Sequence, residues 1–373
     1  MRILNLISTL TGGGAERQLA YLSRELRRRG HDIHVGYSHF GPGGWPTDLG
    51  ATLFPRRSPW NVRRVRDTVA LIGELQPEII QTWSVATDVI GGLAAARSRV
   101  PWIIRESSHP SARRPARIEA LRLVIARRFV SGIVANSPGG VSYWRSQATR
   151  VPVGFLPNAL PQADTPASLS AAAATNGRSS GIFVGRLDAE KNVDVIISAA
   201  ARIIRDRDFT LSICGEGPEG ERLQALARTL GVDAHVRFLG YQQDVLSHLR
   251  SASLSVLVSD VEGTPNAVLE AFASGTPVVL SDIPAHRDLA PPESVMFVGV
   301  KDVAGTADAM THVLDHPEAA AERANRARSA LTTHSMAAAG DALEDFCLDI
   351  LARAGRRLIS PPGSSASSPR SSV

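Results

Sequence analysis

Short apolar segments alternate with amphipathic helical stretches along most of the chain, and this alternation restricts the fold more than any other feature. The first unit has an expected strand over 3–8, a glycine loop, and an expected helix over 15–29 whose leucines share one face. Gly30 follows this helix, as glycine commonly does at a helix C-terminus, and the next strand begins at Asp32. Strands separated by helices form parallel sheets, so the pattern predicts an α/β protein.

The alternation occurs in two stretches of the chain. In the first stretch, further strands are expected over 78–82, 102–105 and 132–135. In the second stretch, the expected strands are 181–184, 209–214, 236–238, 254–258 and 277–280, and the expected helices are 193–205, 220–230, 243–252 and 265–274. Between the two stretches, residues 161–180 lose the periodicity and are rich in Pro, Ala, Ser and Asn, which is typical of a linker.

The chain is therefore predicted to form two doubly wound, Rossmann-like domains, over 1–160 and 181–340, that face each other across a cleft. Its 373 residues also exceed what one hydrophobic core usually serves. A helix over 341–359 is expected to pack back on the N-terminal domain, and the Ser- and Pro-rich tail over 360–373 is expected to be disordered. Ligands of such sheets bind beyond the carboxyl ends of the strands, so the cleft is the expected site.

Composition excludes several classes of protein. No run approaches eighteen apolar residues, so no transmembrane helix is expected, and residues 1–10 are interpreted as a buried strand rather than a secretory signal. Cys214 and Cys347 are too few for a disulfide scaffold or a four-ligand zinc site. We therefore expect a cytoplasmic protein.

Charge is distributed unevenly between the two halves. Residues 1–160 contain 22 arginines, no lysine and 10 acidic residues, a net charge of +12, whereas the rest of the chain carries −7. This asymmetry suggests that the N-terminal half meets an anionic partner, either the inner face of the plasma membrane or a lipid-diphosphate acceptor. Nucleic acid is not expected, because aromatic residues are not interleaved with the arginines. The alternative is that a biased genome composition has replaced lysine by arginine.

Residues 260–271, Asp-Val-Glu-Gly-Thr-Pro-Asn-Ala-Val-Leu-Glu-Ala, form the most informative segment. Thr264 is the expected N-cap of a helix, and Pro265 suits its first position. The free N–H groups at this N-terminus, with that of Asn266 among them, would bind an anion such as phosphate.

Two glutamates of this segment are placed to contact the rest of such a ligand. Glu270 lies about 7 Å further along the helix axis, within reach of a ribose attached to the phosphate. Glu262, on the preceding loop, would lie on the opposite side of the phosphate, where a sugar would sit. The alternative for each is a solvated carboxylate that the helix dipole stabilises.

A second segment, residues 185–192, follows the first strand of the second domain. Arg186 and Lys191 on this loop could neutralise a diphosphate. Lys191 is one of only two lysines in the chain, which suggests a position that needs a compact ammonium group. An ordinary solvated loop is the alternative.

Two glycine-rich loops complete the set. The glycines at 12–14 would let the backbone approach a ligand at the start of the first helix, and the alternative is a tight turn. The segment 215–220 matches the spacing of a dinucleotide-binding loop, but no acidic residue ends the next strand, and Pro218 removes one N–H group. We therefore interpret 215–220 as a structural turn that borders another kind of nucleotide.

These segments, in this order, resemble the family-4 retaining glycosyltransferases of the GT-B fold. The resemblance is carried by Gly-Gly-Gly-Ala-Glu at 12–16, Gly-Arg-Leu at 185–187, Glu-Lys-Asn at 190–192, Gly-Glu-Gly-Pro at 215–218, and Glu-Gly-Thr-Pro-Asn-Ala-Val-Leu-Glu-Ala at 262–271. It covers nearly the whole chain and is most specific in the second domain, where it continues into Gly-Thr-Pro-Val-Val at 275–279.

The resemblance implies roles for individual residues. Arg186 and Lys191 would hold the donor diphosphate, Glu270 would bind the ribose, and Glu262 the transferred sugar. Many relatives have a histidine after a middle strand that contacts this sugar; here His109 lies a few residues late, and a loop histidine is the alternative. The candidate catalytic residues are therefore Glu262, Arg186, Lys191 and His109. The candidate donor-binding residues are Gly13, Gly14, Gly215, Gly217, Leu239, Tyr241, Gly263, Thr264, Pro265, Asn266 and Glu270.

The reaction implied is transfer of a sugar, with retention, from a nucleotide-diphosphate sugar to a hydroxyl of a glycan or lipid-linked acceptor in polysaccharide biosynthesis. A UDP-linked donor is favoured by general likeness. Cationic side chains and helix N–H groups would stabilise the leaving diphosphate, so no metal and no other cofactor is expected. Three alternatives stay open: a nucleotide-sugar epimerase of the same fold, a non-catalytic nucleotide-binding subunit, and a nicotinamide oxidoreductase.

Overall fold

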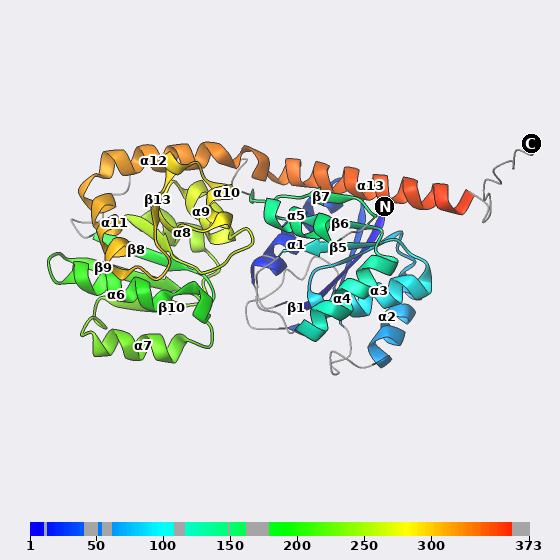
Figure 1. Cartoon of the computed structure of the whole chain (residues 1–373), viewed down its shortest axis with the longest axis horizontal. Coiled ribbons are helices and arrows are strands. Elements are labelled where there is room, and N and C mark those ends of the chain that lie inside the picture. Colours follow the sequence, from blue (N-terminus) through cyan, green and yellow to red (C-terminus); the bar gives the residue numbers. More distant parts are fainter. Residues whose placement is uncertain are drawn as a thin grey trace, which may run out of the picture.

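The computed structural model describes residues 1–10, 13–40, 51–53, 62–107, 116–147, 150–161 and 179–359. Two α/β halves lie side by side, each with a central sheet between helices (Figure 1). Every strand pair in both sheets is parallel. The predicted fold class, two doubly wound halves, is confirmed.

The N-terminal half contains a seven-stranded sheet in the order β3-β2-β1-β4-β5-β6-β7. Its strands are β1 (Arg2–Leu10), β2 (Asp32–Phe40), β3 (Ala51–Leu53), β4 (Ile79–Thr82), β5 (Trp102–Glu106), β6 (Gly132–Ala135) and β7 (Val153–Phe155). Its helices are α1 (Gly14–Arg28), α2 (Val62–Leu75), α3 (Val85–Ser98), α4 (Ala116–Phe129) and α5 (Pro138–Ser146).

The C-terminal half contains a six-stranded sheet in the order β10-β9-β8-β11-β12-β13. Its strands are β8 (Ser179–Val184), β9 (Phe209–Cys214), β10 (Val236–Gly240), β11 (Leu254–Leu257), β12 (Val278–Ser281) and β13 (Met296–Val298). Its α-helices are α6 (Val193–Ile204), α7 (Gly220–Thr229), α8 (Val245–Ser251), α9 (Asn266–Ser274), α10 (Pro284–Leu289), α11 (Val303–Asp315) and α12 (Pro317–Ser329). The 3-10 helices are η3 (Ala189–Lys191), η4 (Pro292–Ser294) and η5 (Ala330–His334).

Strand β1 shows why continuous apolar runs mark the centre of such a sheet. Side chains alternate between its two faces, and both faces are covered. Ile3 and Ile7 pack into the hydrophobic cluster formed with α1, whereas Leu4 and Leu6 pack into a second cluster with α2, α3 and α4. A strand buried on both faces therefore has no polar alternation.

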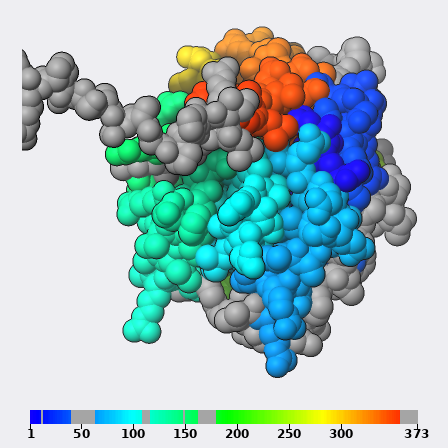
Figure 2. Space-filling model, turned by 90° about the vertical axis from the view of Figure 1, so that its right-hand side faces the viewer, coloured from blue at the N-terminus to red at the C-terminus, as the bar shows by residue number. Residues whose placement is uncertain are grey.

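The last helix, α13 (Met336–Ile359), leaves the C-terminal half and packs on the N-terminal half (Figure 1). It begins at Met336 rather than at residue 341 as expected. Leu343 and Ile350 join the cluster under α1, and Arg29 of the segment after α1 donates to Asp341 at 2.5 Å and to Glu344 at 3.0 Å. Figure 2, which views the N-terminal half from its far side, shows this helix (orange to red) along the top of that half. The chain thus connects its two halves twice.

Several expected segments lie wholly or partly outside the described residues. They include most of the linker over 161–180, the tail over 360–373, and His109. Ser179 and Ser180, counted with the linker on sequence grounds, already belong to β8. Within the described residues no helix is long and apolar enough to cross a bilayer.

Candidate active site between the two halves

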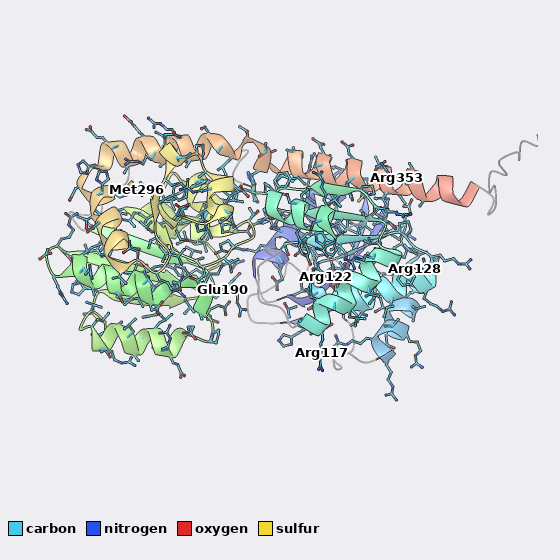
Figure 3. The ribbon with its side chains drawn as sticks, in the orientation of Figure 1. Arg117, Arg122, Arg128, Glu190, Met296 and Arg353 are labelled. Carbon is cyan, nitrogen blue, oxygen red and sulfur yellow. The ribbon has the colours of Figure 1, made fainter. Side chains whose placement is uncertain are left out.

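A cavity of about 780 Å³ lies between the two halves, at the carboxyl ends of their strands. The glycine loop before α1, α1 itself and the ends of β4 and β5 form one wall. The loops after β8, β9 and β11 and the start of α9 form the other. Figure 3 places Glu190, on the loop after β8, at the edge of the C-terminal half that faces the N-terminal half. The position agrees with the general rule for ligands of doubly wound sheets.

Most of the candidate residues line this cavity. They are Gly13, Gly14, Arg186, Lys191, Gly215, Gly217, Tyr241, Glu262, Gly263, Thr264, Pro265 and Asn266. Leu239 and Glu270 do not line it. His109 falls in the part of the chain that the structure does not describe, so its proposed contact stays a prediction.

Lys191 and Glu262 form an ion pair in the cavity wall. Lys191 Nζ donates to Glu262 Oε1 at 2.6 Å, and Ser259 Oγ donates to the same oxygen at 2.7 Å. The loop that carries Lys191 is held by Asn192, whose side-chain amide donates to Val258 O at 2.9 Å and to Asp260 Oδ1 at 2.6 Å. Two loops distant in sequence are therefore held together where the pair forms.

A buried histidine is connected to this pair through hydrogen bonds. His286 is fully buried, and its Nδ1 lies 2.8 Å from Ser281 O, so this nitrogen carries the proton. Ser281 Oγ in turn donates to Ser259 O at 2.7 Å, on the residue that holds Glu262. Burial lowers the pKa of His286, so the ring is neutral at ordinary pH. His286 is thus linked to Glu262 through the hydrogen bonds of Ser281 and Ser259.

Arg186 lies at the mouth of the cavity. Its side chain is 65% exposed and donates from Nε to Asp188 Oδ2 at 2.9 Å. This hydrogen bond raises the pKa of the guanidinium. Arg186 is thus an exposed cation with Asp188 as its neighbouring counterion.

The glycines at 215 and 217 are required by a close approach of two loops. Gly215 has φ +145°, and a Cβ atom there would lie 1.8 Å from Gly185 O. A Cβ atom at Gly217 would lie 2.5 Å from Leu187 O. The turn over 215–220 therefore packs against the loop that carries Arg186, which agrees with its interpretation as a structural turn.

The start of α9 corrects one expectation. The helix begins at Asn266, its N-cap is Pro265, and no side chain caps it, so Thr264 is not the N-cap. The hydroxyl of Thr264 donates instead to Asn136 O at 2.6 Å, in the N-terminal half. The sequence pattern Thr-Pro fits a cap, but the tertiary contact with the other half takes the hydroxyl.

Asn266 joins the two halves through its side chain. Its Oδ1 accepts from Asn158 Nδ2 at 2.8 Å and from Gln18 Nε2 at 3.2 Å, and its Nδ2 donates to Gly14 O at 3.1 Å. Gln18 also bonds the backbone of Ala159 in both directions, at 2.6 and 2.8 Å. The N-terminus of α9 is therefore positioned by residues of the other half, a role that sequence reasoning missed.

Glu270 also contacts the N-terminal half. Its Oε1 accepts from Arg17 Nη1 at 2.6 Å. Burial raises the pKa of this carboxyl group, and Arg17 opposes the shift. Sequence reasoning placed Glu270 near a ribose but missed Arg17, although Arg17 directly follows the quoted segment 12–16.

Arg105 is a second cation that the sequence did not single out. It is 1% exposed, lies at the end of β5 and lines the cavity. It donates to Leu156 O at 2.6 Å and to Asn158 Oδ1 at 3.2 Å, and burial lowers its pKa to about 9. Asn158 in turn donates a hydrogen bond to Asn266 of the other half. Arg105 therefore belongs to the hydrogen-bond network that joins the two halves.

The described residues contain no group of three or more His, Cys, Asp or Glu side chains that could hold a metal ion. The cavity instead offers cations and helix N–H groups. Such groups bind phosphate and stabilise negative charge that develops on it. Fold and cavity together define a two-half α/β protein whose candidate site is built by both halves and suits an anionic ligand.

Comparisons with known proteins agree with this class. The model of the glycosyl transferases group 1 matches residues 173–330, and that of glycosyltransferase family 4 matches residues 12–160. The chain belongs to the family-4 glycosyltransferases of the GT-B fold.

Relatives and solved structures give the same grouping. A glycogen synthase of Mycobacterium tuberculosis is 38% identical over 156 residues, which are 41% of this chain and 38% of that protein. An exopolysaccharide phosphotransferase of Streptomyces coelicolor is 34% identical over 164 residues, 43% of this chain and 17% of that protein. The chain therefore matches less than two thirds of the length of these relatives. The structure of HepE of Anabaena in complex with UDP-glucose superposes on this chain with a TM-score of 0.83 at 18% identity. The superposition covers 94% of this chain and 100% of HepE, which shows that the two proteins share a fold.

Proposed function

We propose that the protein transfers a sugar from a UDP-linked donor to an acceptor hydroxyl, with retention at the anomeric carbon. One observation carries the proposal: Lys191 and Glu262 form a pair at 2.6 Å in the wall of the cavity, beside the N-terminus of α9. A diphosphate at this N-terminus would take Lys191 as a counterion. Glu262 Oε1, which would keep its hydrogen bond from Ser259, could then accept a hydroxyl of the sugar in place of Lys191.

Departure of UDP builds negative charge on the β-phosphate. Lys191, Arg186 and the N–H groups of α9 would stabilise that charge without a metal ion. The leaving phosphate oxygen would accept the proton of the acceptor hydroxyl as the new glycosidic bond forms on the same face. A glycan or a lipid-linked glycan in polysaccharide synthesis is the acceptor that we propose. The binding of UDP-glucose by HepE, and the names of the curated relatives, support the donor and this setting.

The test begins with the melting temperature of the full chain in the presence of UDP-, GDP- and dTDP-sugars. A donor that binds the native state raises this temperature by mass action. We expect a shift with one UDP-sugar, and a shift with GDP- or dTDP-sugars alone would contradict the UDP assignment.

Turnover then separates transfer from the alternatives. UDP release that depends on an added glycan acceptor, with product whose anomeric coupling in NMR equals that of the donor, supports retaining transfer. Conversion of the donor to its epimer without acceptor would identify an epimerase. Binding with neither reaction, over a panel of acceptors, would favour a non-catalytic subunit.

A further inference from the structure

Three cations in the cavity wall are each bonded to one carboxylate. The pairs are Lys191 with Glu262, Arg186 with Asp188, and Arg17 with Glu270. The first two pairs lie within the C-terminal half. The third crosses between the halves, because Arg17 comes from the first turn of α1 and Glu270 from α9.

Arg17 is the member of the Arg17–Glu270 pair that lines the cavity. The side chain of Arg17 is 27% exposed and lines the cavity, whereas that of Glu270 is 6% exposed and does not. Within the described residues, Glu270 Oε2 and Arg17 Nε are buried without a hydrogen-bond partner. The pair is therefore incompletely satisfied, and a ligand in the cavity meets Arg17 and not Glu270.

We propose that Arg17 is a donor-site residue that the N-terminal half supplies. When a nucleotide binds, its ribose hydroxyls take the place of Arg17 on the Glu270 carboxylate. Arg17 then leaves Glu270 and binds the donor diphosphate. The inference rests on the proposed function, which places a nucleotide donor in the cavity.

Two physical arguments favour exchange over simple loss of the pair. A buried carboxylate that loses its only cation is strongly destabilised, and two ribose hydroxyls would replace the lost hydrogen bond and satisfy Oε2 as well. The released guanidinium lies one turn from Gly13 and Gly14, which line the same wall, and it matches the geometry of phosphate oxygens. Each partner of the broken pair thus gains a new one.

The exchange also gives the two halves a shared ligand. Arg17 would reach the diphosphate from α1, while Lys191 and the N-terminus of α9 reach it from the other wall. Nucleotide binding would then need both halves, and Arg17 would distinguish a nucleoside diphosphate from an uncharged nucleoside.

The experiment measures the affinities of the full chain for UDP and for uridine by titration calorimetry. In Arg17→Met we expect UDP to bind about tenfold to a hundredfold more weakly, since one charge-assisted hydrogen-bond partner is lost. Uridine should bind as well as before or more tightly, because Glu270 is uncovered. In Glu270→Gln both affinities should fall by the same factor, so that the ratio between UDP and uridine is kept. Arg17→Lys should restore part of this ratio, and Arg24→Met, an exposed position on the same helix, should change nothing.

The outcomes separate the inference from the function on which it rests. An equal loss of UDP and uridine affinity in Arg17→Met would show a merely structural role and overturn the inference. Unchanged UDP affinity would also overturn it. If Arg17→Met does not fold, the other two variants still test the inference. The exchange predicts that Arg17→Lys lowers the ratio of the UDP affinity to the uridine affinity. It also predicts that Glu270→Gln leaves this ratio unchanged. If the unaltered chain binds neither UDP nor uridine, the proposed function itself is contradicted.

Discussion

Lys191 donates from Nζ to Oε1 of Glu262 over 2.6 Å, between two loops that lie 71 positions apart in the sequence. The carboxylate oxygen that accepts this bond also accepts from Ser259 Oγ. In the proposed function, a diphosphate that draws Lys191 away would leave this oxygen with Ser259 and able to accept a hydroxyl of the sugar. The two residues would then change partners together, and each is expected to lose its function without the other.

Removal of the lysine should abolish most of the turnover. Lys191→Met is expected to lower kcat with a UDP-sugar about a hundredfold to a thousandfold, as loss of one preorganised group at a developing charge does. UDP release measures this rate. The other lysine provides the matched control, because Lys301 is 63% exposed and forms an ion pair with Asp260 at 3.3 Å rather than with Glu262. Lys301→Met should keep full turnover, and equal rates in both variants would contradict the assignment.

The close approach at Gly215 predicts a stability difference between two glycine substitutions. Gly215→Ala should cost roughly 1–3 kcal/mol of unfolding free energy, because the added methyl group meets Gly185 O in a backbone conformation that alanine disfavours. Gly73→Ala in α2 has open space around the new methyl group and should stabilise by about 0.5–1 kcal/mol. Urea unfolding measures both. Gly215→Ala with unaltered stability would show that the two loops separate easily.

The local sequence pattern was enough to predict the strands, the helices and the loops that line the cavity. It was not enough to predict the contacts that join the two halves. Strands such as β6 and β9 were predicted with the bounds that the structure gives, because an apolar run between two helical stretches has few other conformations. Arg17 and Glu270 lie 253 positions apart, and nothing local to either residue indicates the other. Thr264 shows the same limit, since its hydroxyl bonds Asn136 O in the other half instead of capping α9.

A buried ionic cluster under α4 predicts a large loss of stability. Arg122 donates to Asp88 Oδ2 at 2.7 Å and to Glu106 Oε2 at 2.8 Å, and all three side chains are buried. Arg122→Met leaves two buried carboxylates without their cation and should cost roughly 3–5 kcal/mol. Arg128→Met, at an exposed position of the same helix, should stay within about 0.5 kcal/mol of the unaltered chain. Similar unfolding midpoints would contradict the importance of the cluster.

Both cysteines should react slowly. They are free and buried, and burial raises the pKa of Cys214 to about 11 and that of Cys347 to about 12. Only the thiolate is alkylated, so at pH 8 each native thiol should react with iodoacetamide at least about a hundredfold more slowly than an ordinary thiol, and Cys347 more slowly than Cys214. Mass spectrometry of the native and urea-unfolded chain measures the two rates. Rapid labelling of native Cys214, which lines the cavity, would show that this wall opens frequently.

Part of the arginine excess of the N-terminal half is exposed on helix α4. Arg117, Arg127 and Arg128 are exposed on it, together with the apolar side chains of Leu121, Val124 and Phe129. Figure 3 places Arg117 and Arg128 toward opposite ends of the helix. A helix that exposes arginines beside apolar side chains has the composition of one that lies on an anionic bilayer.

Charge reversal on this helix tests the membrane contact that the charge distribution suggests. Each arginine near an anionic surface contributes about 1 kcal/mol, so Arg117→Glu with Arg128→Glu should weaken binding to phosphatidylserine-containing liposomes at least tenfold. Sedimentation measures the bound fraction, and raised salt should lower it for the unaltered chain. Arg202→Glu with Arg237→Glu, at exposed positions of the C-terminal half, is the matched control and should bind as the unaltered chain does. Binding that does not depend on anionic lipid would contradict the membrane contact. The arginine excess would then be explained by a biased genome composition, because α4 would have no partner that fits both its charge and its apolar surface.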